Sequence, residues 1–228
     1  MAIWVVTGAD RGIGAAMCVQ VGARGDTVIA ACLDDASAVR GKAGVEAVSG
    51  VDVTSESGVH ALLRQIGDRR VDVVVNNAGL VIERKLGEFD YQAFQREFAV
   101  NTLGPLRVTE ALLPRMGPGG KIGIVTSRVG SLSENGSGGL YGYRISKAAA
   151  NMAGINLSHE LKPRGIAVIL LHPGSVRTRM TAALTDQATV GMLVEPEVSA
   201  KGLIARVDEL SIETTGTFRH ANGQSLPW

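Results

Sequence analysis

The sequence predicts an α/β fold in which helices cover both faces of a doubly wound parallel sheet of about seven strands. Short runs rich in Val, Ile, Leu and Ala alternate with helical stretches along the whole chain, which is the pattern of strand–helix–strand units. The composition is 45% hydrophobic but only 4% aromatic, which is typical of parallel strands buried on both faces. The 228 residues contain no linker or repeat, so a single domain over residues 1–228 is expected.

Seven apolar runs predict the strands: residues 2–7, 27–32, a third strand that ends over 51–53, 71–75, 121–126, 166–171 and 217–220. Helices are predicted between these runs: up to about residue 23, over 56–66, over 91–116, and around Tyr143 until just before Pro163. The crossover 33–49 carries Gly41 and Gly44 and has poor helical periodicity, so it predicts no clear helix.

Charge and composition exclude several classes of partner. The formal net charge is +1 and no basic run stands out, so no general attraction to nucleic acid or to an anionic membrane is expected. No stretch approaches the ~20 apolar residues of a membrane span, and a first strand that begins by Ile3 leaves no room for a signal peptide. Cys18 and Cys32 are expected to be buried, reduced thiols. These features favour a cytoplasmic protein.

No metal site is expected. The chain has four histidines, and none of them has a second ligand at metal-binding spacing. We therefore interpret His172, which follows the sixth predicted strand, as a structural residue.

A glycine-rich turn joins the first predicted strand to the first predicted helix. It reads Thr7-Gly8-Ala9-Asp10-Arg11-Gly12-Ile13-Gly14. Glycines here permit a tight bend and let the backbone contact a pyrophosphate, which the helix N-terminus then faces. The spacing Gly-x-x-x-Gly-x-Gly differs from the more familiar Gly-x-Gly-x-x-Gly. A plain turn that uses glycine for packing is the alternative, but the position at the first strand–helix junction favours nucleotide binding.

Tyr143 and Lys147 are four residues apart, so one helical turn places the phenol and the ammonium on the same face. An ammonium close to a phenol favours the phenolate and is expected to lower a pKa that is normally about 10. Such a group can transfer a proton to a developing alkoxide. Ser127, Ser131 and Ser133 precede the pair. Together with the nucleotide turn, the pair predicts hydride chemistry on a carbonyl or an alcohol.

Asparagines mark two further positions. Asn101 lies inside the long predicted helix, and Pro105 follows four residues later. Because proline has no N–H, the Asn101 carbonyl loses its intrahelical partner and the helix should kink there, although a bend that serves packing alone is the alternative. Asn76 and Asn77 end the fourth strand, either as turn residues or as a wall of the ligand crevice that such sheets form at their carboxyl edge.

These motifs occur in a fixed order over almost the whole chain: the glycine turn, Asn76-Asn77-Ala78-Gly79, Asn101, an upstream serine, Tyr143-x-x-x-Lys147, and Pro173-Gly174. In this order they resemble the short-chain dehydrogenase/reductase family from end to end. The segments 127–131 and 143–147 and the ending 216–228 are similar to its C-factor and sniffer carbonyl-reductase branch. The resemblance implies a Rossmann-type fold and NAD(P)-dependent hydride transfer between a nicotinamide and a carbonyl or secondary alcohol.

The resemblance also implies catalytic roles. Tyr143 would be the general acid in reduction or the base in oxidation, and Lys147 would lower its pKa and bind the nicotinamide ribose. Ser127, chosen over Ser131 because it stands at a strand end, would hold the substrate oxygen. The Asn101 carbonyl would hold a water that links Lys147 to solvent. Tyr141 is not a candidate acid, since the residue four further on is an isoleucine.

The implied cofactor-binding residues are Thr7, Gly8, Arg11, Gly12, Ile13, Gly14, Asp52, Val53, Asn77, Ala78, Gly79, Tyr143, Lys147, Pro173, Gly174, Val176 and Thr178. Relatives that prefer NAD usually carry an acid at the end of the second strand, here Cys32, and many NADP users carry an arginine next, here Leu33. Asp34 and Asp35 follow and could oppose a 2′-phosphate or reach a ribose hydroxyl. Arg11 is the cation placed for that phosphate, so NADP(H) is expected, with NAD(H) possible.

Residues 177–196 are implied to form a lid over the substrate. Its apolar side chains are Met180, Leu184, Val190, Met192 and Leu193. They favour a small-to-medium apolar ketone, aldehyde or alcohol, unless they simply pack as core. The resemblance further implies a homodimer or homotetramer formed by the long helix and the Tyr143 helix.

Two other functions stay open at this point. One is a cofactor-binding signalling protein of the C-factor type with incidental turnover. The other is an acyl-carrier-protein reductase, for which Arg177 and Arg179 would supply the basic surface.

Overall fold

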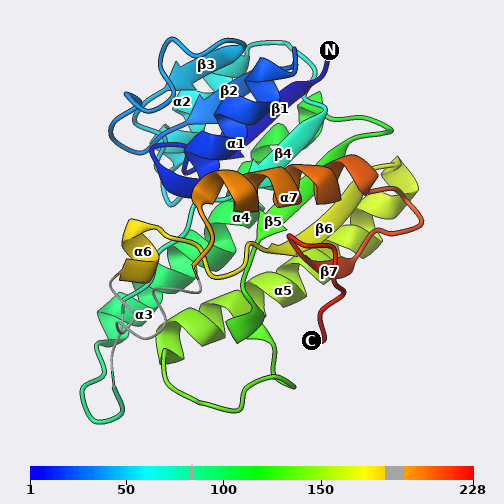
Figure 1. Ribbon diagram of the computed structural model, residues 1–228. Helices are drawn as coiled ribbons and strands as arrows, with labels where there is room; N and C mark the ends of the chain where they lie inside the picture. The colour runs from blue at the N-terminus through cyan, green and yellow to red at the C-terminus, as the bar shows by residue number, and fades with distance from the viewer. Residues whose placement is uncertain (83–84, 183–192) are drawn as a thin grey trace.

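The computed structural model describes residues 1–82, 85–182 and 193–228 (Figure 1). In this part of the chain, seven strands form one parallel sheet in the order β3-β2-β1-β4-β5-β6-β7. The strands are β1 (Ile3–Thr7), β2 (Thr27–Ala31), β3 (Val45–Val48), β4 (Val73–Asn76), β5 (Lys121–Val125), β6 (Ala167–His172) and β7 (Thr217–His220). The chain builds outward from β1 to β3 and then returns to β4 on the other side of β1. The doubly wound sheet is therefore confirmed, and its strand order reverses between β1 and β4.

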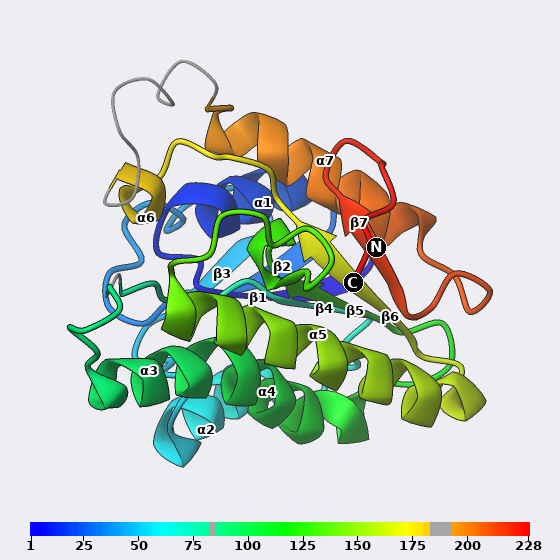
Figure 2. The same ribbon diagram turned by 90° about the horizontal axis from the view of Figure 1, so that it is seen from below.

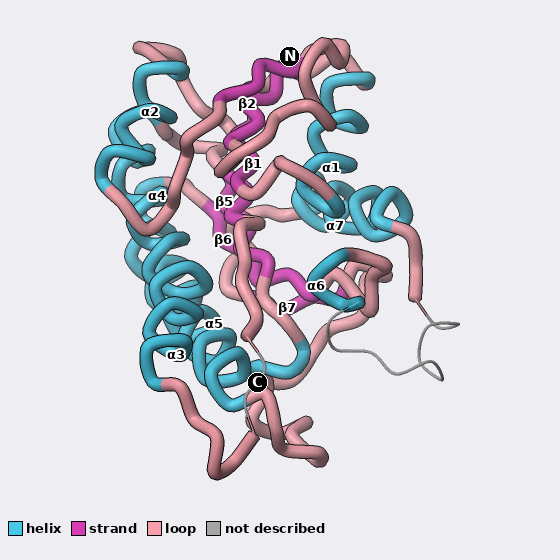
Figure 3. The backbone as a smooth tube through the Cα atoms, turned by 90° about the vertical axis from the view of Figure 1, so that its left-hand side faces the viewer, coloured by secondary structure: helices cyan, strands magenta, loops and turns pink. Residues whose placement is uncertain are grey.

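Helices cover both faces of the sheet, as Figure 2 and Figure 3 show. One layer holds α1 (Gly12–Ala23) and α7 (Pro196–Glu209), with the short α6 (Arg179–Ala182) on the same side, and the other holds α2 (Glu56–Ile66), α3 (Tyr91–Phe98), α4 (Gly104–Leu112) and α5 (Tyr141–Leu161). Successive residues of β1 alternate between the two cores: Trp4 and Val6 face the α1–α7 side, and Val5 faces the α2–α4 side. Because both faces are covered, the central strands β1, β2 and β4 are almost entirely apolar.

The third strand differs from the sequence-based prediction. It spans Val45–Val48 and pairs with β2, whereas residues 51–53 lie beyond it without strand structure. Gly50 has a φ of +77°, which ends the extended run. Val51 and Val53 are buried against the α2 side of the core, so their apolar character reflects packing rather than strand pairing.

Helix α7 is the second difference, because the sequence analysis predicted no helix there. It begins at Pro196. Proline is tolerated in the first turn because N–H groups there have no intrahelical acceptor. Ala200, Leu203 and Val207 are buried in the core that α7 shares with α1. The only signal for this helix in the sequence was the spacing of these three apolar residues, and the helix against which they pack, α1, lies near the other end of the chain.

The predicted helix over 91–116 is one helical column with an irregular centre. Between α3 and α4 lies a π-helical turn, η1 (Ala99–Leu103), and a 3₁₀ turn, η2 (Leu113–Arg115), ends the column. The Gly104 N–H bonds to the Ala99 carbonyl five residues back. The irregularity that Pro105 predicts at Asn101 is therefore present as a π-helical turn.

Both cysteines are free and buried, which confirms the prediction of reduced thiols. Burial and, to a smaller extent, the charges of Asp10 and Asp35 raise the pKa of the Cys32 thiol to about 11. No helix among the described residues is long and apolar enough to cross a membrane. Within the same residues, His, Cys, Asp and Glu side chains form no group of three or more that could hold a metal ion.

Close packing of α1 on the β2–β3 crossover yields a first prediction. A Cβ on Gly22 would lie 2.2 Å from the carbonyl oxygen of Ala43, which is backbone and cannot move aside cheaply. We expect Gly22→Ala to lower the free energy of unfolding by about 1–3 kcal/mol, measured by urea denaturation. Gly136→Ala is the control, since a Cβ there meets no atom within 4 Å. An equal cost at both positions would refute the role of this contact.

Candidate active site

The candidate site residues gather at the carboxyl edge of the sheet. Thr7 ends β1, Asn76 ends β4, Ser127 follows β5 and Pro173 follows β6. All these strands are parallel neighbours, so their carboxyl ends open on one side of the molecule. This edge includes the strand-order reversal between β1 and β4, which is where sheets of this kind bind ligands.

The glycine turn between β1 and α1 is folded tightly on itself. Gly8 and Gly12 have φ values of +64° and +54°, which side chains rarely adopt. A Cβ on Gly14 would lie 2.3 Å from the Gly8 carbonyl oxygen, and a Cβ on Gly12 would lie 3.4 Å from the Thr178 methyl group. The turn thus forms a cradle of bare backbone at the N-terminus of α1, which fits the pyrophosphate of a dinucleotide.

Asn77 fastens the end of β4 to this turn. Its side-chain Nδ2 donates to the carbonyl oxygens of Thr7 at 3.0 Å and Gly8 at 3.1 Å. The Thr7 hydroxyl accepts hydrogen bonds from the N–H groups of Asn77 and Ala78, both at 3.1 Å. Asn76 is buried and donates to the Thr109 hydroxyl at 3.2 Å. The two asparagines therefore hold the end of β4 against α4 and against the glycine turn by bonding to the protein itself.

Tyr143 and Lys147 lie one turn apart on α5, as the spacing predicts. The Lys147 Nζ is 5.7 Å from the centroid of the Tyr143 ring and donates to the Val125 carbonyl at 2.9 Å. Burial lowers the pKa of Lys147 to about 8. Burial raises the pKa of Tyr143 to about 12, a hydrogen bond with Ser127 lowers it in part, and the charge of Glu97 raises it.

This direction contradicts the expectation that Lys147 lowers the pKa of Tyr143. The reason is that loss of water around the phenol outweighs the hydrogen bond with Ser127, and the charge of Glu97 acts in the same direction as burial. The ammonium itself is directed to the carbonyl of Val125, at the end of β5.

The three candidate serines have different surroundings. Ser127 is 8% exposed and shares a hydrogen bond with Tyr143. The hydroxyls of Ser131 and Ser133 lie 3.2 Å from each other, and Ser133 donates to the Trp228 carbonyl at 2.7 Å. Of the three, Ser127 is thus the serine that contacts the phenol. Tyr141 packs edge-on against the ring of Phe89, with the centroids 4.9 Å apart.

Asn101 connects the end of β4 to α5 through its side chain. Its Nδ2 donates to the Leu80 carbonyl at 2.7 Å and to the Ser146 hydroxyl at 2.9 Å. Its Oδ1 accepts from the Leu80 N–H at 2.8 Å. The side chain is consequently a clamp, while its backbone carbonyl faces the position where Pro105 supplies no N–H.

Sequence reasoning did not identify Glu97. This side chain is fully buried, its Oε1 accepts from the Ile82 N–H at 2.8 Å, and its charge raises the pKa of Tyr143. The available signal was its position four residues before Asn101, which places both side chains on one helical face.

The segment after β6 returns to the glycine turn. Val176 is buried and forms a parallel bridge with Val194, and Thr178 lies against Gly12. Gly174 has a φ of +86°, and the Pro173 carbonyl accepts from the Ser199 hydroxyl at 2.7 Å.

The predicted lid is described only in part. Leu184, Val190 and Met192 lie outside the described residues. Within them, the Met180 methyl group would lie 3.6 Å from a Cβ on Gly79, so this apolar side chain reaches the crevice.

Asp52 and Val53, two of the implied cofactor-binding residues, follow β3. The Asp52 carboxylate accepts from the N–H and hydroxyl of Thr54 at 2.8 and 2.7 Å. Val53 packs under Gly104, where a Cβ would lie 2.8 Å from its Cγ2.

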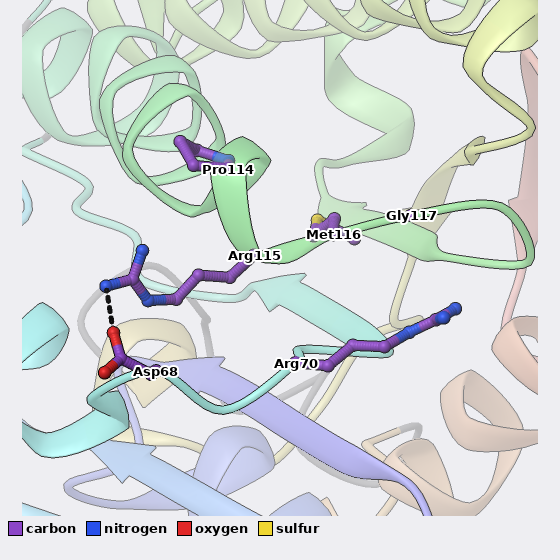
Figure 4. A pocket seen from close by; sticks show the side chains of 6 residues that line it. All are labelled: Asp68, Arg70, Pro114, Arg115, Met116 and Gly117. Carbon is purple, nitrogen blue, oxygen red and sulfur yellow. Dashed lines mark ion pairs between the residues drawn. The ribbon is translucent and has the colours of Figure 1, made fainter.

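A surface hollow elsewhere has no part in this arrangement (Figure 4). It lies near the amino ends of β4 and β5 and is lined by Asp68, Arg70, Pro114, Arg115, Met116 and Gly117. Arg115 pairs with Asp68 at 3.5 Å, and Arg70 donates to the Pro118 carbonyl at 2.7 Å. Both guanidinium groups are thus used in holding local structure.

Comparison with known proteins decides the family. The family model described as short chain dehydrogenase matches residues 2–189. This chain belongs to the short-chain dehydrogenase family. The enzyme is therefore an NAD(P)-dependent oxidoreductase that acts on carbonyl or alcohol groups, as the order of motifs predicts.

Individual relatives agree with this assignment. This chain is 45% identical over 230 residues to 1-hydroxy-2-glutathionyl-2-methyl-3-butene dehydrogenase of Rhodococcus sp. (strain AD45), with 100% of each chain covered. It is 45% identical over 161 residues to C-signal of Myxococcus xanthus, covering 69% of this chain and 93% of that protein. A carbonyl reductase from Pseudomonas aeruginosa PAO1 in complex with NADP shares its fold with a TM-score of 0.78, at 27% identity and with 100% of each chain covered.

The buried ammonium makes stability depend on pH. The pKa of Lys147 falls from its ordinary 10.5 to about 8 in the folded protein, so the unfolded chain holds this proton more tightly between those values. The free energy of unfolding should therefore rise with pH from about 8 to 10. In Lys147→Met this contribution should vanish, which urea denaturation at several pH values would show.

The exposed Lys162, changed to Met, is the matched control and should keep the pH dependence of the wild type. Curves for Lys147→Met and wild type that run parallel from pH 8 to 10 would contradict the buried-ammonium account.

Proposed function

We propose that Tyr143, Lys147, Ser127 and Asn101 are the catalytic group of this oxidoreductase. The observation that carries the proposal is the hydrogen bond between Ser127 and Tyr143, together with the buried Lys147 one turn along α5, whose Nζ lies 5.7 Å from the centroid of the Tyr143 ring. When bound, the nicotinamide cofactor supplies or accepts the hydride. Ser127 holds the substrate oxygen, and the Tyr143 O–H donates its proton to that oxygen in reduction and takes one back in oxidation.

The pKa values support the reductive direction for Tyr143. Burial raises its pKa to about 12, so the phenol is protonated throughout the neutral range. Its proton can still pass to an alkoxide, which is a stronger base. Lys147 then stabilises the phenolate while it remains an ammonium, and the water that we place on the Asn101 carbonyl returns the proton from solvent.

Removing the phenolic hydroxyl tests this assignment. We expect Tyr143→Phe to reduce kcat by about 100-fold or more, with dissociation constants for the dinucleotide within about twofold of wild type. The kcat is measured with an alcohol or carbonyl that the wild type converts, and the dissociation constants are measured by calorimetry. Tyr141→Phe is the matched control, since its ring packs on Phe89. Activity retained in Tyr143→Phe would remove this residue from the mechanism.

For the cofactor, we propose NADP(H) as the favoured form, with NAD(H) also accepted. The support is Arg11, an exposed cation at the N-cap of α1, together with the NADP complex of the similar carbonyl reductase. The proposed contacts of the dinucleotide are those of the glycine turn, the Asn77–Gly79 wall, Asp52 and Val53, and the Pro173–Thr178 segment.

Arg11 gives the corresponding prediction. In Arg11→Ala, the dissociation constant for NADPH should rise about tenfold, while that for NADH should change little, because only NADPH carries the 2′-phosphate. Arg64→Ala, which removes an exposed cation on α2, is the control for loss of surface charge alone. Equal losses for both dinucleotides in Arg11→Ala would eliminate the phosphate contact.

For the substrate, we propose a small or medium apolar carbonyl or alcohol, supported by Met180 at the crevice. A second candidate is an alcohol that carries a glutathione thioether, favoured by 45% identity over the full chain to a dehydrogenase named for such a compound. The exposed Arg179 is the cation proposed to face its carboxylates, since Arg128, next to Ser127, is paired with Glu134 at 2.8 Å. To distinguish the two substrate classes, kcat/KM is compared for matched alcohols with and without the glutathionyl group, and a higher value with the group favours the second candidate.

Two other functions have narrower support. A signalling role with incidental turnover is favoured by the similarity to C-signal, which covers 69% of this chain. Reduction of a carrier-protein substrate would need a basic surface, but Arg177 is paired with Glu195 at 2.8 Å.

We further propose a cytoplasmic single-domain protein that forms a homodimer or homotetramer. The support for assembly is a groove between the α3–η1–α4 column and α5, lined by Phe98, Thr102, Leu103, Leu106, Ala149, Met152, Ala153, Asn156, Leu157 and Glu160. Met152 is 63% exposed and Phe98 37%, which is the apolar exposure that a second copy would cover.

A further inference from the structure

Asp10 reaches from the glycine turn to the loop that follows β2. Its carboxylate accepts the Leu33 N–H on Oδ2 at 3.1 Å and the Asp34 N–H on Oδ1 at 2.9 Å. Both loop residues are exposed. An anionic side chain of the phosphate-binding turn therefore bridges two consecutive backbone donors at the end of the second strand.

The position matters because folds of this type read the 2′-position of the adenosine ribose there. Successive backbone N–H groups form a concave site that suits one anion. In this chain the Asp10 carboxylate already fills that pair of donors. Neither of the side chains expected to read the ribose is available, since Cys32 is fully buried and Leu33 carries no charge.

The charges around this loop are balanced closely. Asp34 and Asp35 follow Leu33, and the Asp35 carboxylate accepts from the N–H and hydroxyl of Ser37 at 2.9 and 2.5 Å. The hydrogen bonds from Ser37 lower the pKa of Asp35, and the charges of Arg40 and, to a smaller extent, Arg11 lower it further. The cation expected to attract a 2′-phosphate thus lies among carboxylates that oppose one.

We propose that Asp10 is a specificity-determining residue that opposes the 2′-phosphate of NADP(H). It takes up the two backbone donors that a phosphate would use, and its negative charge repels a second anion. Arg11 and Asp10 then act in opposite directions on the same group, so the wild-type enzyme accepts both dinucleotides. The inference rests on the proposed dinucleotide site.

Asp10→Asn tests it, because this change removes the charge and keeps one acceptor for the loop. Dissociation constants for NAD⁺ and NADP⁺ are measured by calorimetry on the full chain, with kcat/KM for both reduced forms. We expect the preference for NADP⁺ over NAD⁺ to rise about tenfold, chiefly through tighter binding of NADP⁺. The matched control is Asp68→Asn, a carboxylate 107% exposed in its side chain at the far edge of the sheet, which should leave the preference unchanged.

A purely structural role gives a different pattern. If Asp10 only tethers the loop, Asp10→Asn weakens both dinucleotides by the same factor, and the unchanged preference overturns the proposal. Asp10→Ala, which removes tether and charge together, should raise the preference for NADP⁺ while weakening both ligands. Wild-type protein that binds neither dinucleotide would instead contradict the proposed function itself, and this inference with it.

Discussion

The hydrogen bonds of the Asn101 side chain join the two segments on which the site depends. The amide bonds both backbone groups of Leu80, just beyond β4, and the Ser146 hydroxyl on α5. Pro105 helps to set the helical distortion around Asn101, since it withholds the N–H that a regular helix would use there. One local irregularity in a helical column thereby fixes the segment after β4 relative to the helix that carries Tyr143 and Lys147.

Burial determines the electrostatics of that helix. Tyr143 and Lys147 are shifted in opposite directions, each toward its neutral form, because both have lost water. The folded protein therefore holds a neutral Tyr143 phenol beside a Lys147 ammonium that loses its proton more readily than an exposed lysine does. A substrate oxygen placed on Ser127 would meet a protonated donor, and the cost of burying the lysine is offset only in part by its bond to the Val125 carbonyl.

Local periodicity was sufficient to predict much of this. The four-residue spacing of Tyr143 and Lys147, the glycine turn and the strand ends follow from backbone geometry, so the sequence predicts them directly. The prediction that the pKa of Tyr143 is lowered was wrong, because the pKa is raised by burial, and burial arises from segments that are far apart in the chain.

The other misses have the same origin. Helix α7 is recognisable only by its fit against α1, and Val51 and Val53 are apolar because they pack in the core on the α2 side rather than pairing in the sheet. The Asp10 contact likewise joins positions 23 and 24 residues apart. Such contacts depend on the tertiary fold, which no local pattern encodes.

The most direct test of the account is turnover of NADPH and NADH in parallel against apolar ketones, aldehydes and diketones. The reverse reaction would be followed on matched alcohols with and without a glutathionyl group. The account predicts substrate-dependent oxidation or reduction of the nicotinamide with at least one pair. Tight dinucleotide binding without turnover on any of these compounds would contradict the catalytic assignment and favour a signalling role.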